Sequence, residues 1–252
     1  EENEPVTFNH VCFRYPHAEQ NVLDDISFTA KPGETVAFIG STGSGKSTLV
    51  NLLPRFFDVS EGSITIGDTD IRNVTQKDLR NHIGYIPQKG VLFSGTVESN
   101  LKYADENATD ATIERALEIS QAKEFVEQMP EKLDEPISQG GTNVSGGQKQ
   151  RLSIARALSK KANIYIFDDT FSALDYKTDA KLRKALSEMI AETKATVFIV
   201  AQRISTIKHA DQIIVLDKGR IAGIGKHDDL LKNCDVYREI AKSQLSQEEL
   251  NK

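Results

Sequence analysis

The fold of this chain is decided by the stretch Gly40-Ser41-Thr42-Gly43-Ser44-Gly45-Lys46-Ser47-Thr48. It matches the P-loop pattern, in which glycines let successive backbone N–H groups turn toward phosphate oxygens without a side-chain clash. A continuous apolar run at residues 35–39 precedes the stretch and predicts a strand, and a helical run at residues 49–53 follows it. The helix N-terminus adds positive potential. In this pattern the Lys46 amine reaches the β- and γ-phosphates and the Ser47 hydroxyl binds Mg²⁺, so we predict a site for a nucleoside triphosphate with Mg²⁺.

Further continuous apolar runs lie at residues 164–167, 196–200 and 213–216. Continuous runs are typical of strands that are covered on both faces, as in a parallel sheet between helices. Helical patterns at residues 152–158 and 182–190 alternate with them. We therefore predict an α/β P-loop NTPase core with a mostly parallel sheet.

The two ends of the P-loop core have a different pattern. Apolar residues alternate at Val6 and Phe8 and then change phase from Val11 onward, which predicts half-buried antiparallel strands with a bulge near His10. Residues 89–161 contain little strand pattern and read as a helical insertion. We expect one domain over residues 1–252: a core with an antiparallel β-subdomain over about 1–88 and 162–252, and a helical subdomain over about 89–161.

Composition excludes several function classes. The chain has 252 residues, 31 basic and 37 acidic side chains and a net charge of −6, which argues against a nucleic-acid partner held by bulk positive charge. Two cysteines are too few for a disulfide framework or a four-thiolate metal site. Apolar runs such as residues 197–201 are far shorter than the roughly 18 residues of a membrane span.

A P-loop needs a second magnesium ligand at the end of a neighbouring strand. The run Ile164-Tyr165-Ile166-Phe167 ends in Asp168, and this carboxylate is our candidate. Many core strands end in an aspartate at a turn, so the assignment depends on its pairing with the P-loop. We predict that Ser47 and Asp168 lie close together.

A second motif connects the chain to a known family. Asn143-Val144-Ser145-Gly146-Gly147-Gln148-Lys149-Gln150-Arg151 resembles the signature motif of ATP-binding cassette (ABC) ATPases, with Val144 where leucine is usual. Alone, the stretch reads equally well as a simple helix cap. Three further motifs match in order: Tyr15 where the family stacks an aromatic ring on adenine, Gln88 as the Q-loop glutamine, and Ser172-Ala173-Leu174-Asp175 as the D-loop. Tyr15 also reads as an ordinary strand aromatic.

The resemblance implies a set of site residues. It implies nucleotide contacts at Tyr15, Gly40, Ser41, Thr42, Gly43, Ser44, Gly45, Lys46, Ser47, Thr48, Gln88, Val144, Ser145, Gly146, Gly147, Gln148 and Asp175. It implies magnesium contacts at Ser47, Gln88 and Asp168. Catalytic roles fall on Lys46, Gln88, Asp169 and Gln202.

The resemblance also implies partners. Such domains work as head-to-tail pairs that bury two ATP molecules between the P-loop of one and the signature of the other, and the closing and opening of the pair drive a transmembrane domain. Leu92-Phe93-Ser94-Gly95-Thr96-Val97, followed by Asn100-Leu101, looks like the exporter branch, whose membrane helices precede this domain on the same polypeptide. We therefore expect an N-terminal membrane domain in the natural chain, and a location at the cytoplasmic face of the cell membrane.

Two residues depart from the family pattern. Asp169 stands where a glutamate normally polarises the attacking water, and Gln202 stands where a histidine normally contacts the γ-phosphate. Aspartate and glutamate differ by only about 0.4 pKa units, so the handicap is geometric, and a misplacement of about 1 Å can cost about 100-fold in rate. Gln202 donates hydrogen bonds but carries no charge.

Two departures at one water-activating centre suggest a site that binds ATP and hydrolyses it poorly. This pattern is similar to one half of heterodimeric ABC exporters, whose partner cassette keeps the intact Glu and His. Three alternatives remain: a slow homodimeric exporter ATPase, a soluble ABC ATPase outside transport, and the free-standing cassette of an importer. Finding hydrophobic spans encoded upstream would separate an exporter from an importer.

Overall fold

A six-stranded, mostly parallel sheet forms the centre of the molecule. The computed structural model describes residues 3–250, apart from the side chains of 246–250. The strand order is β12-β11-β3-β10-β9-β6. Its strands are β3 (Thr35–Gly40), β6 (Ile83–Ile86), β9 (Ile164–Asp168), β10 (Thr196–Val200), β11 (Gln212–Asp217) and β12 (Arg220–Gly225). All neighbours pair parallel except β11 and β12. Every residue of β9 and β10 is buried, which is why their apolar runs are continuous.

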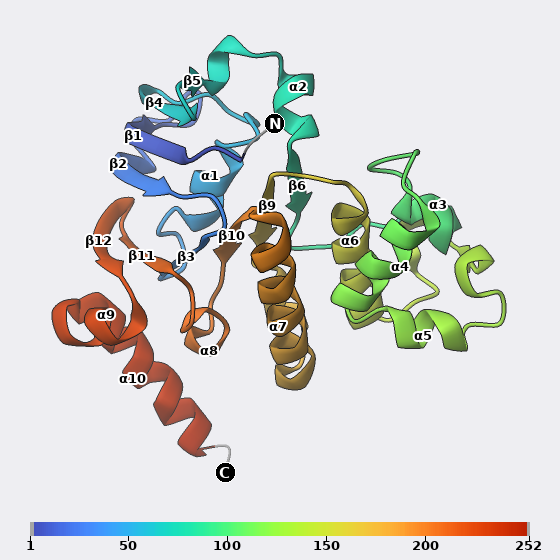
Figure 1. Ribbon diagram of the computed structural model, residues 1–252. Helices are drawn as coiled ribbons and strands as arrows, with labels where there is room; N and C mark the ends of the chain where they lie inside the picture. The colour runs from blue at the N-terminus through green and yellow to red at the C-terminus, as the bar shows by residue number, and fades with distance from the viewer. Residues whose placement is uncertain (1–2, 251–252) are drawn as a thin grey trace.

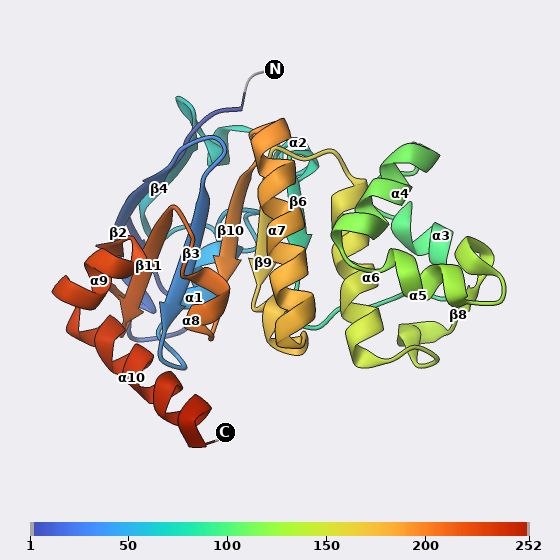
Figure 2. The ribbon, with the colours of Figure 1, turned by 60° about the horizontal axis from the view of Figure 1, so that its bottom comes forward.

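Helices and a second sheet cover the two faces of the central sheet. The helices on this core are α1 (Lys46–Asn51), α7 (Tyr176–Thr193), α8 (Ile204–Ile207), α9 (His227–Asn233) and α10 (Asp235–Leu250). Side chains of β3 alternate between two apolar clusters: Phe38 packs with Leu49 of α1, whereas Ile39 packs in the cluster that contains Leu186 of α7. The sheet is thus buried on both sides, with α7 in front of β9 and β10 in Figure 2. This confirms the predicted α/β core.

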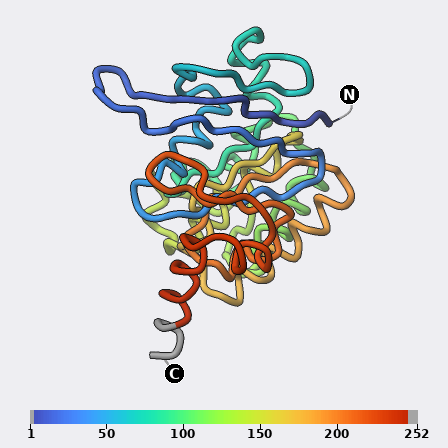
Figure 3. Tube along the Cα trace, turned by 90° about the vertical axis from the view of Figure 1, so that its left-hand side faces the viewer, coloured from blue at the N-terminus to red at the C-terminus, as the bar shows by residue number. Residues whose placement is uncertain are grey.

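The second sheet is antiparallel and lies over the α1 side, as the layer at the top of Figure 3. Its strands, in the order β2-β1-β4-β5, are β1 (Val6–Phe13), β2 (Leu23–Ala30), β4 (Glu61–Ile66) and β5 (Thr69–Asp70). The pairing of β1 with β2 shifts register between Phe8 and Val11, and His10 has a φ of 48°. The bulge predicted near His10 is therefore confirmed.

A group of helices lies beyond the β6 end of the central sheet, at the right of Figure 1. It contains α3 (Val97–Leu101), α4 (Asp110–Ile119), α5 (Lys123–Gln128), α6 (Gly146–Ser159) and the short antiparallel pair β7 (Gly95–Thr96) and β8 (Pro136–Ile137). Helix α6 begins six residues before the apolar pattern that predicted it, because the Ser145 side chain caps it. None of the helices within the described residues is sufficiently long and apolar to span a membrane.

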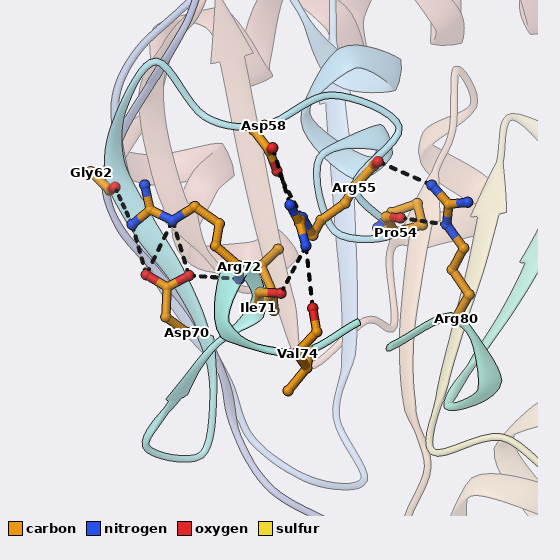
Figure 4. Close-up of polar contacts among 9 residues, drawn as sticks. All are labelled: Pro54, Arg55, Asp58, Gly62, Asp70, Ile71, Arg72, Val74 and Arg80. Carbon is orange, nitrogen blue, oxygen red and sulfur yellow. Dashed lines mark hydrogen bonds and ion pairs between the residues drawn. The ribbon is translucent and has the colours of Figure 1, made fainter. Parts of the chain in front are cut away.

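Two arginines tie the loop after α1 to the segment at residues 71–81 (Figure 4). Arg80, on α2 (Gln76–Asn81), donates hydrogen bonds to the carbonyl oxygens of Pro54 and Arg55 over 2.9 and 3.1 Å. Arg55 pairs with Asp58 at 2.8 Å and donates to the Val74 carbonyl at 3.3 Å. The loop that continues to Phe57 is thereby held in place. The 3₁₀ turns are η1 (Ile71–Asn73), η2 (Lys132–Asp134), η3 (Gln139–Gly141) and η4 (Thr170–Ala173).

Candidate functional site

The P-loop connects the end of β3 to α1 and has the backbone that its glycines allow. Gly43 and Gly45 have φ values of 78° and 102°, a region that L side chains rarely adopt. A Cβ atom on Gly40 would lie 2.3 Å from the Leu216 carbonyl oxygen, so a larger residue is excluded there. Gly45 is the N-cap of α1 and provides no side-chain cap. The first N–H groups of the helix are thus open to an anion.

Lys46 folds back over this loop. Its Nζ donates hydrogen bonds to the carbonyl oxygens of Gly40 and Ser41 over 2.8 and 3.0 Å. Burial lowers the pKa of Lys46, and the Asp169 carboxylate opposes that shift. The ammonium group therefore lies beside the turn, within electrostatic reach of the Asp169 carboxylate.

Asp168 and Ser47 meet as predicted from the sequence. The Ser47 hydroxyl donates to Oδ1 of Asp168 over 2.7 Å. The other carboxylate oxygen lies 3.1 Å from the Tyr85 hydroxyl, which also lies 2.9 Å from Oδ1 of Asn51. Burial, together with Asp168, raises the pKa of Tyr85, so the phenol keeps its proton. Sequence reasoning had not assigned a role to Tyr85; its position on β6, next to β9, is known only from the strand pairing.

The Asp169 carboxylate accepts hydrogen bonds from two glutamines. Its Oδ2 accepts hydrogen bonds from Nε2 of Gln88 over 3.1 Å and from Nε2 of Gln202 over 2.8 Å. Its Oδ1 is buried without a hydrogen-bond partner. Burial raises the pKa of this carboxyl, and the adjacent Asp168 adds to the effect, whereas the hydrogen bond from Gln202 opposes it. A buried carboxylate with one free oxygen is poised to accept a hydrogen bond from a water molecule.

Asp169 also has a left-handed backbone, with φ 52° and ψ 34°. Aspartate and asparagine are enriched in this region, because their short polar side chains hydrogen-bond locally. The conformation turns the chain sharply from β9 into η4, where the Ser172 hydroxyl donates to the Asp169 carbonyl at 2.9 Å. Aspartate at position 169 therefore suits the left-handed turn as well as the hydrogen bonds of its carboxylate.

A buried ion-pair network supports the loop after β10. Asp179 of α7 is 1% exposed, and its Oδ2 accepts hydrogen bonds from Arg203 at 2.7 Å and from the Thr206 hydroxyl at 2.8 Å. Arg183 pairs with the other oxygen at 2.5 Å. Arg203 also donates to the Phe171 carbonyl at 2.7 Å. This guanidinium thus connects the loop of Gln202 to η4. Sequence reasoning missed the network, although Asp179 and Arg183 show the i, i+4 spacing of a helical ion pair.

Tyr15 lies just beyond the end of β1, beside the start of α1. Its hydroxyl is hydrogen-bonded to Oγ1 of Thr48 at 2.8 Å. Its ring meets those of Phe13 and Phe57 edge to face, with centroids 4.9 and 5.2 Å apart. The structure places the ring next to the P-loop and holds it by its hydroxyl and by two aromatic neighbours.

The signature residues lie elsewhere. Ser145 and Gln148 form a reciprocal capping box at the start of α6, with both hydrogen bonds at 3.1 Å. Gly146 and Gly147 face open space. Figures 1 and 2 both show α6 on the opposite side of β6 and β9 from α1. The exposed Asp175 caps α7 through the Thr178 amide at 2.8 Å.

The structure therefore separates the predicted site residues into two groups. The first surrounds the P-loop and comprises Tyr15, Gly40, Ser41, Thr42, Gly43, Ser44, Gly45, Lys46, Ser47, Thr48, Gln88, Asp168, Asp169 and Gln202. The second is carried by the start of α6 and comprises Val144, Ser145, Gly146, Gly147 and Gln148, while Asp175 lies at the start of α7. One chain by itself does not bring the first group against the second.

The residues around Asp168 fit a magnesium ion. Ser47, Asp168 and Gln88 offer hydroxyl, carboxylate and amide oxygens, which are the hard ligands that Mg²⁺ takes. The described residues contain no group of three or more His, Cys, Asp or Glu side chains suited to a metal.

Comparison with known proteins agrees with this geometry. The chain matches the protein-family model described as ABC transporter over residues 23–172. It is 47% identical over 235 residues to an uncharacterized ABC transporter ATP-binding protein of Mycobacterium tuberculosis, covering 92% of this chain and 40% of the relative. It is 42% identical over 235 residues to the ATP-dependent lipid A-core flippase of Desulfotalea psychrophila, covering 93% of this chain and 40% of the flippase.

A solved structure gives the same result. This chain resembles a bacterial Atm1-family ABC exporter with ATP bound, with a TM-score of 0.91 and 37% identity over 96% of this chain and 42% of the exporter. The chain thus spans about two fifths of the length of the relatives that it matches.

Proposed function

This chain belongs to the ABC transporter family, as one of its ATP-binding domains, and on that premise we propose that it binds ATP with Mg²⁺ and powers export across a membrane. The observation that carries the proposal is the convergence at the P-loop. The Ser47 hydroxyl touches Asp168 at 2.7 Å, and Asp169 with its free oxygen follows directly. Lys46 and Ser47 come from one stretch of sequence and the two carboxylates from another, about 120 residues later, and the two stretches meet at one turn.

The backbone of the P-loop and Lys46 would hold the phosphates. The Nζ of Lys46 would exchange the carbonyl oxygens of Gly40 and Ser41 for phosphate oxygens, which accept stronger, charge-assisted hydrogen bonds. Tyr15 would stack on the adenine. Ser47, Asp168 and Gln88 would hold the magnesium ion, which when bound neutralises charge on the β- and γ-phosphates.

The water-activating residues of this site are weaker than those usual in the family. Oδ1 of Asp169 would accept a hydrogen bond from the attacking water, and Gln202 would donate to the γ-phosphate. Asp169 is one methylene shorter than glutamate, and Gln202 carries no charge. We therefore propose that this site binds ATP and hydrolyses it slowly.

We propose a head-to-tail pair as the working unit. The start of α6 faces open space at Gly146 and Gly147 and lies away from α1, so a second cassette would be needed to close each ATP site. A partner with intact Glu and His would receive the signature of this chain, with Asp175 of the D-loop at the interface. The result is a heterodimer with one slow and one competent site.

We propose that the cassette is attached to a transmembrane domain. Relatives that are more than twice as long, among them a lipid A-core flippase and an Atm1-family exporter, support an attached transmembrane domain. The cassette would then lie at the cytoplasmic face of the membrane. Within it we propose a core over residues 1–88 and 162–252 and a signature subdomain over residues 89–161, which carries α3 to α6.

A mixing experiment tests the shared site. A repaired chain carries Asp169→Glu and Gln202→His to restore the catalytic pair, and Gly147→Asp to break its own signature. By itself, the repaired chain should hydrolyse ATP slowly. Mixed with the wild-type chain it should hydrolyse ATP in a single turnover about tenfold faster or more, because the wild-type signature completes the repaired site.

The matched control replaces the wild-type chain with one that carries only Gly147→Asp, which should give no gain. A mixture no faster than the sum of its parts would refute the shared site. Fast single turnover by the wild-type chain alone would refute the slow site, and slow turnover that rises with the square of its concentration would favour the homodimer.

A further inference from the structure

Gln244, on the last helix, is hydrogen-bonded to the loop that carries Gln202. Nε2 of Gln244 donates to the carbonyl oxygen of Gln202 over 2.5 Å. Oε1 of the same amide accepts from the backbone N–H of Ile204 over 2.8 Å. A glutamine amide has one acceptor and two donor hydrogens, and here it pairs with the backbone as a neighbouring strand would. The two backbone groups that it holds lie on either side of Arg203.

Helix α10 is placed so that Gln244 can reach this loop. Tyr237 is fully buried, Ala241 is 8% exposed, and Gln244 follows at i+7 from Tyr237, so the three share one face of the helix. The Tyr237 hydroxyl is hydrogen-bonded to Nδ1 of His227 at 2.5 Å, which connects the start of α10 to α9. The helix is therefore anchored two turns before Gln244, and its position sets that of the amide.

The hydrogen bonds from Gln244 hold the backbone of Gln202, the residue whose side chain contacts Asp169. The side chain of Gln202 donates to Oδ2 of Asp169 at 2.8 Å while its own carbonyl is held by Gln244. On the other side of the loop, Arg203 is held by Asp179 at 2.7 Å. The backbone that follows Gln202 is thus fixed twice, by α10 through Gln244 and by α7 through the Arg203 side chain.

We propose that Gln244 is a positioning residue for Gln202: it holds the backbone of the loop so that the Gln202 amide is aimed at Asp169 and at the γ-phosphate of bound ATP. The inference rests on the proposed function for the γ-phosphate. It places part of the nucleotide discrimination of this cassette in its last helix, far along the chain from the P-loop.

The test compares two nucleotides that differ in the γ-phosphate. The affinities of ADP and of a non-hydrolysable ATP analogue are measured with Mg²⁺ by equilibrium fluorescence, for the wild-type chain and for Gln244→Met, which keeps the length of the side chain but removes both hydrogen bonds. The preference for the analogue over ADP should fall about three- to tenfold in the variant, while the ADP affinity stays unchanged. Gln244→Glu keeps the acceptor for Ile204 and should lie between the two.

Two further measurements keep the outcomes apart. Ser243→Ala changes the exposed neighbouring residue and should leave the preference as in the wild type. Hydrogen exchange should show a faster-exchanging Ile204 amide in Gln244→Met. An unchanged preference in Gln244→Met would overturn the inference, whether or not the Ile204 amide exchanges faster, whereas a wild-type chain that bound neither nucleotide would overturn the proposed function instead.

Discussion

Nε2 of Gln202 lies 2.8 Å from Oδ2 of Asp169, so two of the residues that differ from the family pattern touch each other although they are 33 positions apart. The contact follows from the sheet. Asp169 comes directly after β9, Gln202 comes two residues after β10, and the two strands are parallel neighbours with Val200 opposite Asp168. Parallel neighbours end at the same edge, which brings the two substitutions into one site.

Loss of the P-loop lysine should reduce nucleotide binding. Lys46→Ala removes a cation that we place on the phosphates, and a hydrogen bond to a charged group contributes about 1.5–3 kcal/mol, so the ATP affinity should fall about 10- to 100-fold. Titration calorimetry measures it, with the exposed Lys161→Ala as the control. Equal affinities in the two variants would contradict the assigned role of Lys46.

Lengthening the water-activating carboxylate should increase the rate. Asp169→Glu moves the carboxylate outward by one methylene, and single-turnover hydrolysis should rise about 10- to 100-fold if distance is the handicap. The left-handed backbone at φ 52° suits aspartate, so the same change should lower the stability of the chain by about 1 kcal/mol. No gain in rate would place the handicap at Gln202 or in a missing partner.

Stability should depend on pH through Asp169. Burial raises its pKa in the folded chain above the unfolded value of about 3.9, so the folded state favours the protonated form. The contribution of this group to stability is therefore greatest at low pH and is lost as pH rises from about 4 through the raised folded pKa.

Asp169→Asn removes that penalty and tolerates the same backbone. Without nucleotide, Asp169→Asn should therefore melt at a higher temperature than the wild type, and this difference should grow between pH 4 and pH 8. A difference that is constant or shrinks with pH would show that the carboxyl is not destabilised by burial.

The buried ion pair should contribute more to stability than an exposed one. Asp179→Asn leaves two guanidinium groups without their anion, and their partial exposure reduces the cost to about 2–3 kcal/mol from the 3–5 of a fully buried pair. The control is Glu192→Gln, which breaks the exposed pair with Arg115 and should cost less than about 1 kcal/mol. Urea unfolding measures both, and equal losses would refute the structural role of the network.

Adenine stacking should depend on the ring of Tyr15 and not on its hydroxyl. Stacking of one base on an aromatic side chain contributes about 1–3 kcal/mol, so Tyr15→Ala should weaken ATP binding about 5- to 100-fold, whereas Tyr15→Phe should bind within about twofold of the wild type. The exposed Tyr103→Ala on the helical side serves as the control. If both Tyr15 variants bound like the wild type, the aromatic would be structural only.

Much of the core could be predicted because its signals are local. The P-loop, its flanking strand and helix, and the bulge at His10 are each written in fewer than about ten consecutive residues. The pair β7 and β8 could not be predicted, because two-residue strands are too short to show an alternation. The role of Tyr85 was missed for another reason: its contact with Asp168 exists only once β6 has paired with β9.

The residue order alone predicted the α/β core and the phosphate-binding turn, and it showed Asp169 and Gln202 as residues that differ from the family pattern, since motif spacing and apolar periodicity are properties of neighbouring residues. Contacts across the chain depended on folding. Only the packed strands and helices bring Gln202 onto Asp169 and Gln244 onto the backbone of Gln202, and only they leave the start of α6 turned away from α1. Hydrogen bonds between residues far apart in the sequence follow no spacing pattern, so only the tertiary packing determines which of them form.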